Sequence, residues 1–89
     1  MGFFGGVKKI SREEFKKALW KLREHGFSQE QVNEVENIFR GDLYEEGSSA
    51  GISSEELKKE IAWLKEHSSS HHLSHEQVDK IEETLQHYL

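Results

Sequence analysis

The chain contains no cysteine, no proline and no long apolar run. Without cysteine it cannot form disulfides, thiolate metal sites or thiol nucleophiles. Without proline it lacks the residue that most strongly interrupts helices. No hydrophobic stretch approaches the roughly 20 residues that span a bilayer. With 89 residues, we expect one small domain, and we expect it in the cytoplasm.

A helix-start signal, by contrast, occurs four times. It consists of an apolar residue, a serine, and a glutamate or glutamine three positions later, followed by another apolar residue. In such a capping box the serine hydroxyl accepts from a helical N–H, and the acid or amide accepts from the serine N–H. The signal predicts four helices near residues 11–25, 28–40, 53–67 and 74–88, capped by Ser11, Ser28, Ser53 and Ser74.

The two halves of the chain align with one another. Residues 10–25 align without gaps with residues 52–67, and residues 27–43 align with residues 73–89. Each half therefore reads as two helices joined by a turn, which is an αα-hairpin. The second half has a longer inner turn, because Ser68–His72 replaces the short connection at Gly26.

Apolar residues in every predicted helix follow one stripe of a 3.6-residue period. We therefore predict an all-α fold: a flexible N-terminal arm at residues 1–9, then one four-helix domain at 10–89. Its two duplicated hairpins, 10–43 and 52–89, pack in one small bundle. The predicted core contains Ile10, Phe15, Ala18, Leu19, Leu22, Phe27, Val32, Val35, Phe39, Leu43, Ile52, Leu57, Ile61, Leu64, Leu73, Val78, Ile81, Leu85 and Leu89.

Charge is distributed unevenly along the chain, whose net charge is −5. Residues 1–23 hold seven basic and two acidic side chains, giving +5, whereas residues 24–89 hold five basic and fifteen acidic ones, giving −10. Such a distribution can steer partners toward the basic end, or it can be neutralised by contacts within the fold.

Trp20 and Trp63 lie off the apolar stripes. On a helical wheel Trp20 falls about 140° from Phe15, and Trp63 falls about 240° from Leu57. The aligned residues in the other half are Ala62 and Lys21, so the repeated scaffold does not require tryptophan at either position. Each tryptophan is a candidate anchor for a partner; the alternative is packing over a helix edge or under a loop.

Basic side chains surround Trp20, which suits either an acidic protein partner or a phosphate-bearing one. The alternative is a solvated face on which a lysine covers the indole ring. The sequence predicts a non-enzymatic adaptor or regulatory module that binds a partner protein. Its predicted contact residues are Phe3, Phe4, Lys16, Lys17, Trp20, Arg23 and Trp63.

A nucleic-acid-binding regulator acting through the first helix is the alternative. The turn around Gly26 resembles that of a helix-turn-helix. However, the helix that would enter the major groove carries Glu30, Glu34 and Glu36, which would repel phosphates.

A calcium- or metal-responsive module is a third possibility. Residues 51–56 resemble the second half of an EF-hand loop, with Ile52 at the eighth place and Glu56 at the twelfth. The first, third and fifth places hold Glu45, Gly47 and Ser49, and the sixth holds Ala50. A competent loop needs oxygen ligands at the first three of these places, where Gly47 has no side chain, and glycine at the sixth.

Five of the six histidines lie between His67 and His87, and three of them, His71, His72 and His75, are close in sequence. His71 and His72 precede the last predicted helix and His75 lies in its first turn, so no i, i+4 pair on one helix is available to hold a transition metal rigidly. Local pH sensitivity is therefore the favoured interpretation. We find no nucleophile with a base at usable spacing, and we expect no enzyme activity, cofactor or metal site.

Overall fold

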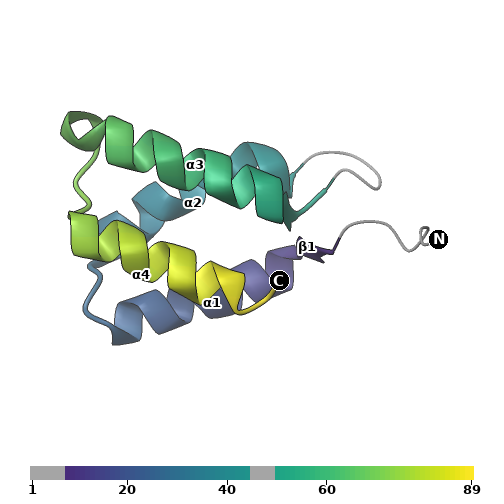
Figure 1. The fold of residues 1–89 in the computed structure, drawn as a ribbon. Helices are drawn as coiled ribbons and strands as arrows, with labels where there is room; N and C mark the ends of the chain where they lie inside the picture. The colour runs from purple at the N-terminus through teal and green to yellow at the C-terminus, as the bar shows by residue number, and fades with distance from the viewer. Residues whose placement is uncertain (1–7, 45–49) are drawn as a thin grey trace.

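A computed structural model describes residues 8–44 and 50–89. It confirms an all-α bundle (Figure 1), in which four helices pack together and two short strands pair at one end. In chain order the elements are β1 (Lys9–Ile10), α1 (Arg12–Glu24), α2 (Gln29–Leu43), β2 (Ile52–Ser53), α3 (Ser54–Glu66), the 3₁₀ turn η2 (Ser68–Ser70) and α4 (His75–Gln86).

All four predicted capping boxes are formed. At α1 the Ser11 hydroxyl accepts from the Glu14 N–H at 3.1 Å, and Glu14 Oε1 accepts from the Ser11 N–H at 3.0 Å. The same reciprocal pair occurs at the starts of α2, α3 and α4. These local signals therefore fix where each helix begins.

The end of α2 differs from the prediction. The helix continues three residues beyond Arg40, to Leu43, although Gly41 had suggested the start of a loop. Leu43 is only 2% exposed and follows Phe39 by one helical turn, so both residues pack into the core. Burial of Leu43 offsets the modest cost of a glycine inside a helix.

The predicted stripes form one core. The rings of Phe15 and Phe39 lie at its centre, with centroids 5.8 Å apart. Seventeen of the nineteen predicted core residues are buried, whereas Leu19 and Leu89 are partly buried and pack against the cluster from its edge. The partial exposure of Leu19 leaves an apolar surface between α1 and α2.

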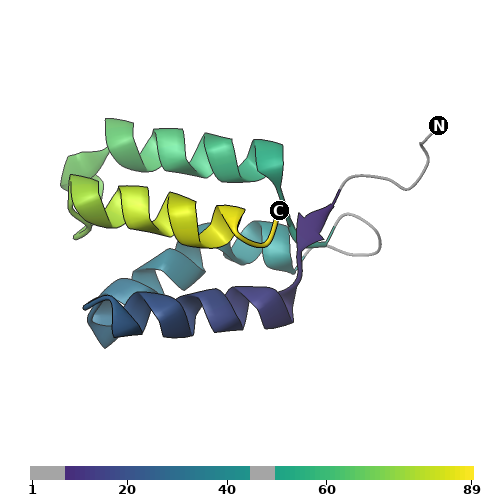
Figure 2. The same ribbon diagram turned by 60° about the horizontal axis from the view of Figure 1, so that its bottom comes forward.

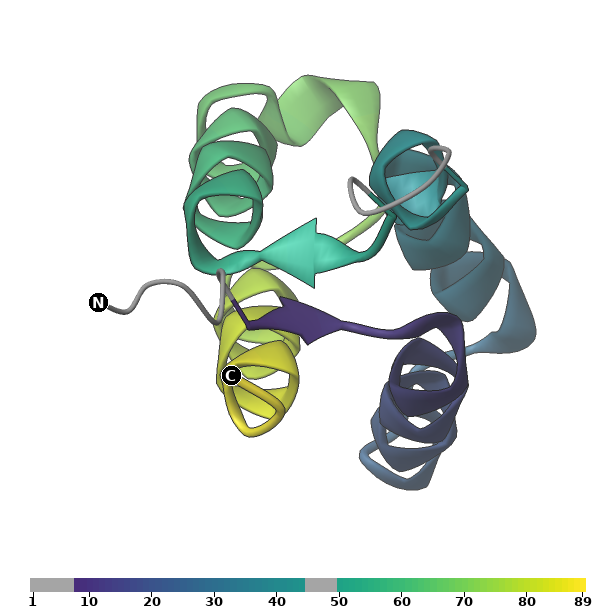
Figure 3. The same ribbon diagram turned by 90° about the vertical axis from the view of Figure 1, so that its right-hand side faces the viewer.

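The helices occupy four corners around this core. Figure 2 shows α4 lying between α1 and α3, and Figure 3 shows the strand pair crossing one end of the bundle between the helices. None of the described helices is long and apolar enough to cross a membrane.

The strand pair was not predicted. Ile10 pairs with Ile52 and Lys9 with Ser53, in antiparallel orientation. Two-residue strands carry no recognisable period, and the sequence placed both isoleucines only as apolar residues before the caps. Because Lys9 belongs to β1, regular structure begins one residue before the predicted domain start.

Two contacts join residues that the sequence alignment makes equivalent. One is the Ile10–Ile52 pair. The other joins Gln31 and Gln77, whose amides exchange hydrogen bonds of 3.1 and 3.0 Å. Equivalent residues of two like units meet in this way near a two-fold axis, while the duplication itself stays a prediction from the sequence.

Among the described glycines, Gly51 has the least space around its Cα. Its φ is +105°, and a Cβ placed there would lie 2.9 Å from the carbonyl oxygen of Ile10. Gly26 also has a positive φ, +95°, as its position after α1 predicts, but a Cβ there would meet nothing within 4 Å. Both positions therefore favour glycine, but only Gly51 also needs the space.

We predict that Gly26→Ala lowers the free energy of unfolding by about 1–2 kcal/mol, because alanine is strained in the left-handed backbone conformation. Gly51→Ala should cost at least about 1 kcal/mol more, because β1 must also move. Urea unfolding of both variants measures the difference. Equal losses would mean that the contact between Gly51 and β1 contributes nothing to stability.

The caps give a second prediction. Ser53→Ala and Ser74→Ala should each lower the free energy of unfolding by about 0.5–2 kcal/mol, since each removes a bond to a helical N–H. Ser54→Ala is the matched control, because Ser54 is exposed and is not a cap. Unchanged thermal midpoints for both cap variants would contradict the assigned helix starts.

Candidate functional site

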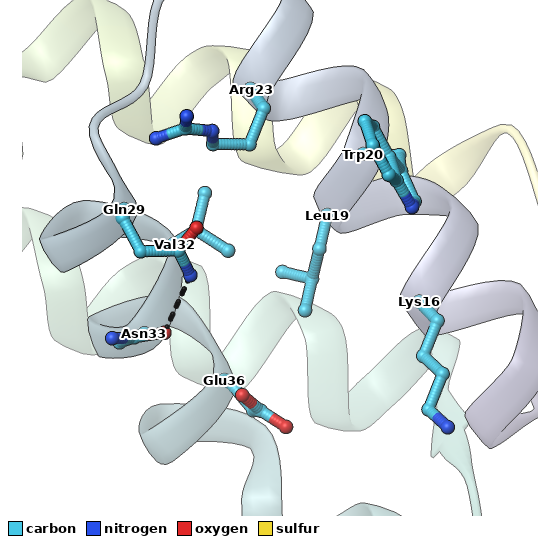
Figure 4. A pocket seen from close by; sticks show the side chains of 8 residues that line it. All are labelled: Lys16, Leu19, Trp20, Arg23, Gln29, Val32, Asn33 and Glu36. Carbon is cyan, nitrogen blue, oxygen red and sulfur yellow. Dashed lines mark hydrogen bonds between the residues drawn. The ribbon is translucent and has the colours of Figure 1, made fainter.

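An open groove of about 460 Å³ runs between α1 and α2. Figure 4 shows its lining side chains, four from each helix. In both helices these residues are spaced at i, i+3, i+4 and i+7, which places them on one face. They are Lys16, Leu19, Trp20 and Arg23 from α1, and Gln29, Val32, Asn33 and Glu36 from α2.

The floor of the groove is apolar. Leu19 is partly buried against the core, and Val32 is 5% exposed. Trp20 stands beside this floor with 73% of its surface exposed, the largest fraction among the described large hydrophobic side chains. The prediction that Trp20 lies off the buried stripe is therefore confirmed.

The two ends of the groove differ in charge. Arg23 lies at one end with the amide side chains of α2, and Lys16 lies toward the other with Glu36 (Figure 4). The amide Nε2 of Gln29 donates to Asn33 Oδ1 at 2.9 Å. Among residues 8–44 and 50–89, neither Lys16 nor Arg23 forms an ion pair. The Arg23 end is therefore positive, while Glu36 offsets Lys16.

The fold brings together three of the predicted contact residues: Lys16, Trp20 and Arg23. Lys17 is exposed on α1 but does not line the groove, and Trp63 lies on α3. Phe3 and Phe4 lie outside the described residues. The contribution of α2 was missed, although its lining residues show the same helical spacing as those of α1.

Other basic side chains of α1 make contacts within the chain. Arg12 Nε donates to the carbonyl of Leu43 at 3.1 Å, and its guanidinium lies 4.3 Å from the centre of the Tyr44 ring. Lys21 Nζ lies 5.3 Å from the centre of the Tyr88 ring. The basic face predicted around Trp20 is therefore partly engaged by the fold itself.

Trp63 is in a different environment from Trp20. It is 39% exposed, and its ring stacks on His67 with centroids 4.8 Å apart and planes 17° apart. The Nδ1 atom of His67 also lies 3.0 Å from the Trp63 carbonyl oxygen. Trp63 thus packs on its own helix, as the alternative interpretation of the sequence allowed.

A smaller hollow of about 220 Å³ adjoins Trp63. Burial raises the pKa of the Glu60 carboxyl there, the positive charge of Lys59 lowers it, and the negative charge of Glu56 raises it again, so the net shift is upward. The hollow is lined by Asp42, Glu56, Lys59, Glu60 and Trp63.

The stretch that resembles half of an EF-hand loop has structural roles. Ile52 belongs to β2, and Glu56 completes the α3 capping box. Burial acts to raise the pKa of Glu56, but hydrogen bonds with Ser53 and Asp42 and the charge of Lys9 outweigh it and lower the pKa. The first, third and fifth places of that loop fall among residues 45–49, which the structure does not describe, and the described residues contain no cluster of three metal-ligating side chains.

His71 is buried, with 8% of its surface exposed, and it connects α3 to the turn before α4. Its Nδ1 accepts from the Leu73 N–H at 3.1 Å, so the ring proton is on Nε2. Nε2 then donates to the Leu64 carbonyl at 2.7 Å. Both ring nitrogens are occupied, which gives this histidine a structural role that the sequence did not reveal.

No protein-family model, curated protein sequence or solved structure matches the chain.

We predict that His71→Ala lowers the free energy of unfolding by at least about 2 kcal/mol, because the Leu73 N–H and the Leu64 carbonyl lose their partner. His75→Ala is the control; His75 is exposed in the first turn of α4, and we expect an effect within about 0.5 kcal/mol. Chemical denaturation measures both. Similar small effects in the two variants would contradict the bridging role.

Proposed function

We propose that the chain is a non-enzymatic interaction module that binds a partner protein through the groove between α1 and α2. The observation that carries this proposal is the 73% exposure of Trp20 beside an apolar floor. An exposed indole next to an open apolar groove is a typical binding anchor, since its burial on association releases a large apolar area.

Comparison of the two halves supports this assignment. Ala62 occupies the position in α3 that Trp20 occupies in α1, and it also is exposed. The helical scaffold therefore does not need an aromatic side chain there for packing. Removal of the Trp20 ring should consequently affect binding far more than folding.

Nucleic-acid binding is the second candidate, and the cluster of Lys16, Lys17 and Arg23 near Trp20 favours it. Two observations count against it. Glu36 lines the groove, and α2 also carries Glu30 and Glu34. In addition, Arg12 is engaged with Leu43 and Tyr44. A phosphate backbone in the groove would meet the carboxylate of Glu36, on a helix that carries two further glutamates outside the groove.

The test is Trp20→Ala, with Trp63→Ala as the matched loss of an indole from another helix. For a partner captured from nuclease-treated lysate of the native cells and then purified, Trp20→Ala should weaken binding by about 2 kcal/mol or more. The free energy of unfolding of Trp20→Ala should differ from that of wild type by less than about 0.5 kcal/mol. Equal binding by wild type and Trp20→Ala would contradict the proposal.

Salt separates the two candidates. Contacts of Lys16, Lys17 and Arg23 with phosphates should weaken about tenfold or more between 50 and 200 mM salt. Burial of an indole in an apolar contact should change much less, because salt does not screen it. Labelled single- and double-stranded oligonucleotides provide the direct probe; tight, salt-sensitive, Trp20-dependent binding to them would favour the nucleic-acid function.

A further inference from the structure

The groove of the first half can be compared with the aligned positions of the second half. In the sequence alignment, Arg23 and Asn33 correspond to Lys65 and Asp79. Lys65 Nζ lies 3.4 Å from Asp79 Oδ1, so in the second half an ion pair links the two helices at this position. In the first half the aligned residue is the neutral Asn33, and Arg23 forms no ion pair with any described residue.

The hollow beside Lys65 in the second half is also far smaller than the groove beside Arg23. The hollow around Lys65, His75 and Val78 has a volume of about 10 Å³, and His71 from the longer inner turn contributes to its wall. The groove around the aligned residues of the first half holds about 460 Å³. One half thus supplies its own carboxylate beside Lys65, whereas the other has an open groove with Arg23 at its end.

We propose that the groove takes an amphipathic helix of the partner, whose apolar face covers Leu19, Trp20 and Val32 and whose carboxylate pairs with Arg23. This inference rests on the proposed function and specifies its partner. The partner's carboxylate would lie beside Arg23 in the first half as the Asp79 carboxylate lies beside Lys65 in the second half. Arginine is well suited to it, because its guanidinium holds a carboxylate through two parallel hydrogen bonds.

A helix fits this groove better than an extended segment does. Both walls are α-helices, whose backbone N–H and C=O groups bond within each helix, so they offer no edge for an added strand. A segment buried on the apolar floor must therefore satisfy its own backbone groups, as a helix does. The lining residues span i to i+7 on each wall, about 10 Å, which two turns of a helix match.

The test begins with a displayed library of unconstrained random peptides of about 15 residues, long enough for four helical turns, selected on the full chain and counter-selected on Trp20→Ala. We expect the retained sequences to share an apolar stripe with an acidic residue at one end. We then measure the affinity of a selected peptide, labelled for fluorescence anisotropy, for wild type and two α2 variants.

Asn33→Asp places the carboxylate of the second half beside Arg23, where it competes with that of the peptide. Asn37→Asp is the matched control, since it makes the same charge change on α2 at an exposed position outside this groove. Asn33→Asp should weaken binding at least about tenfold, and Asn37→Asp less than about threefold. Circular dichroism of each variant verifies that the helices remain formed.

Each other outcome is decisive. If no retained peptide depends on Trp20, both this inference and the proposed function fail. If Trp20-dependent peptides are extended, or lack an acidic residue, the proposed function stands and the helical acidic partner is wrong. Equal weakening by Asn33→Asp and Asn37→Asp would show a general charge effect and overturn the pairing with Arg23. Trp20-dependent dimerisation, seen by sedimentation, would assign the groove to a second copy instead.

Discussion

The antiparallel contact of Ile10 with Ile52 is the constraint on which the rest of the bundle depends. Both side chains are fully buried, and each is followed directly by the serine that caps α1 or α3. The strand pair therefore sets the starting points of two helices relative to each other. At α2 and α4, the Gln31–Gln77 amide pair does the same near their caps. These two links join helices of different halves, α1 with α3 and α2 with α4, whereas the short turn at Gly26 joins α1 and α2, the two walls of the groove.

The parts of the fold that could be predicted are those determined by local chemistry. A capping box involves residues three positions apart, so Ser11, Ser28, Ser53 and Ser74 reveal the helix starts without knowledge of the tertiary structure. Contacts between distant segments have no comparable local signal in the sequence. The strand pair and the bond from Arg12 to the Leu43 carbonyl, 31 residues away, depend on how the helices assemble. The end of α2 was missed for the same reason, because burial of Leu43 outweighs the local preference of Gly41.

The sequence predicted the part of the candidate site that lies on one helix, α1. The wheel position of Trp20 indicated exposure correctly, but the same criterion could not distinguish it from Trp63, which stacks on His67. A helical wheel gives the direction in which a side chain points, but it does not show which residues of other segments lie beside that side chain. Leu19 satisfied the apolar stripe and was placed in the core, yet it lies at the edge of the core and forms part of the groove floor. The residues of α2 became part of the site only through the packing of the two helices.

The two halves of the chain differ at residues that contribute little to stability, which explains how one of them can keep an open groove. An exposed ion pair such as Lys65–Asp79 contributes little to stability, so its aligned position in the first half can lose the carboxylate at little cost. Replacing alanine by tryptophan on an exposed helix face is similarly tolerated, because no core contact is disturbed. The buried links, Ile10 with Ile52 and the shared core, hold the scaffold in both halves. One half can therefore carry an open groove that ends at Arg23 while the other pairs Lys65 with Asp79, because the features that differ lie outside the contacts on which folding depends.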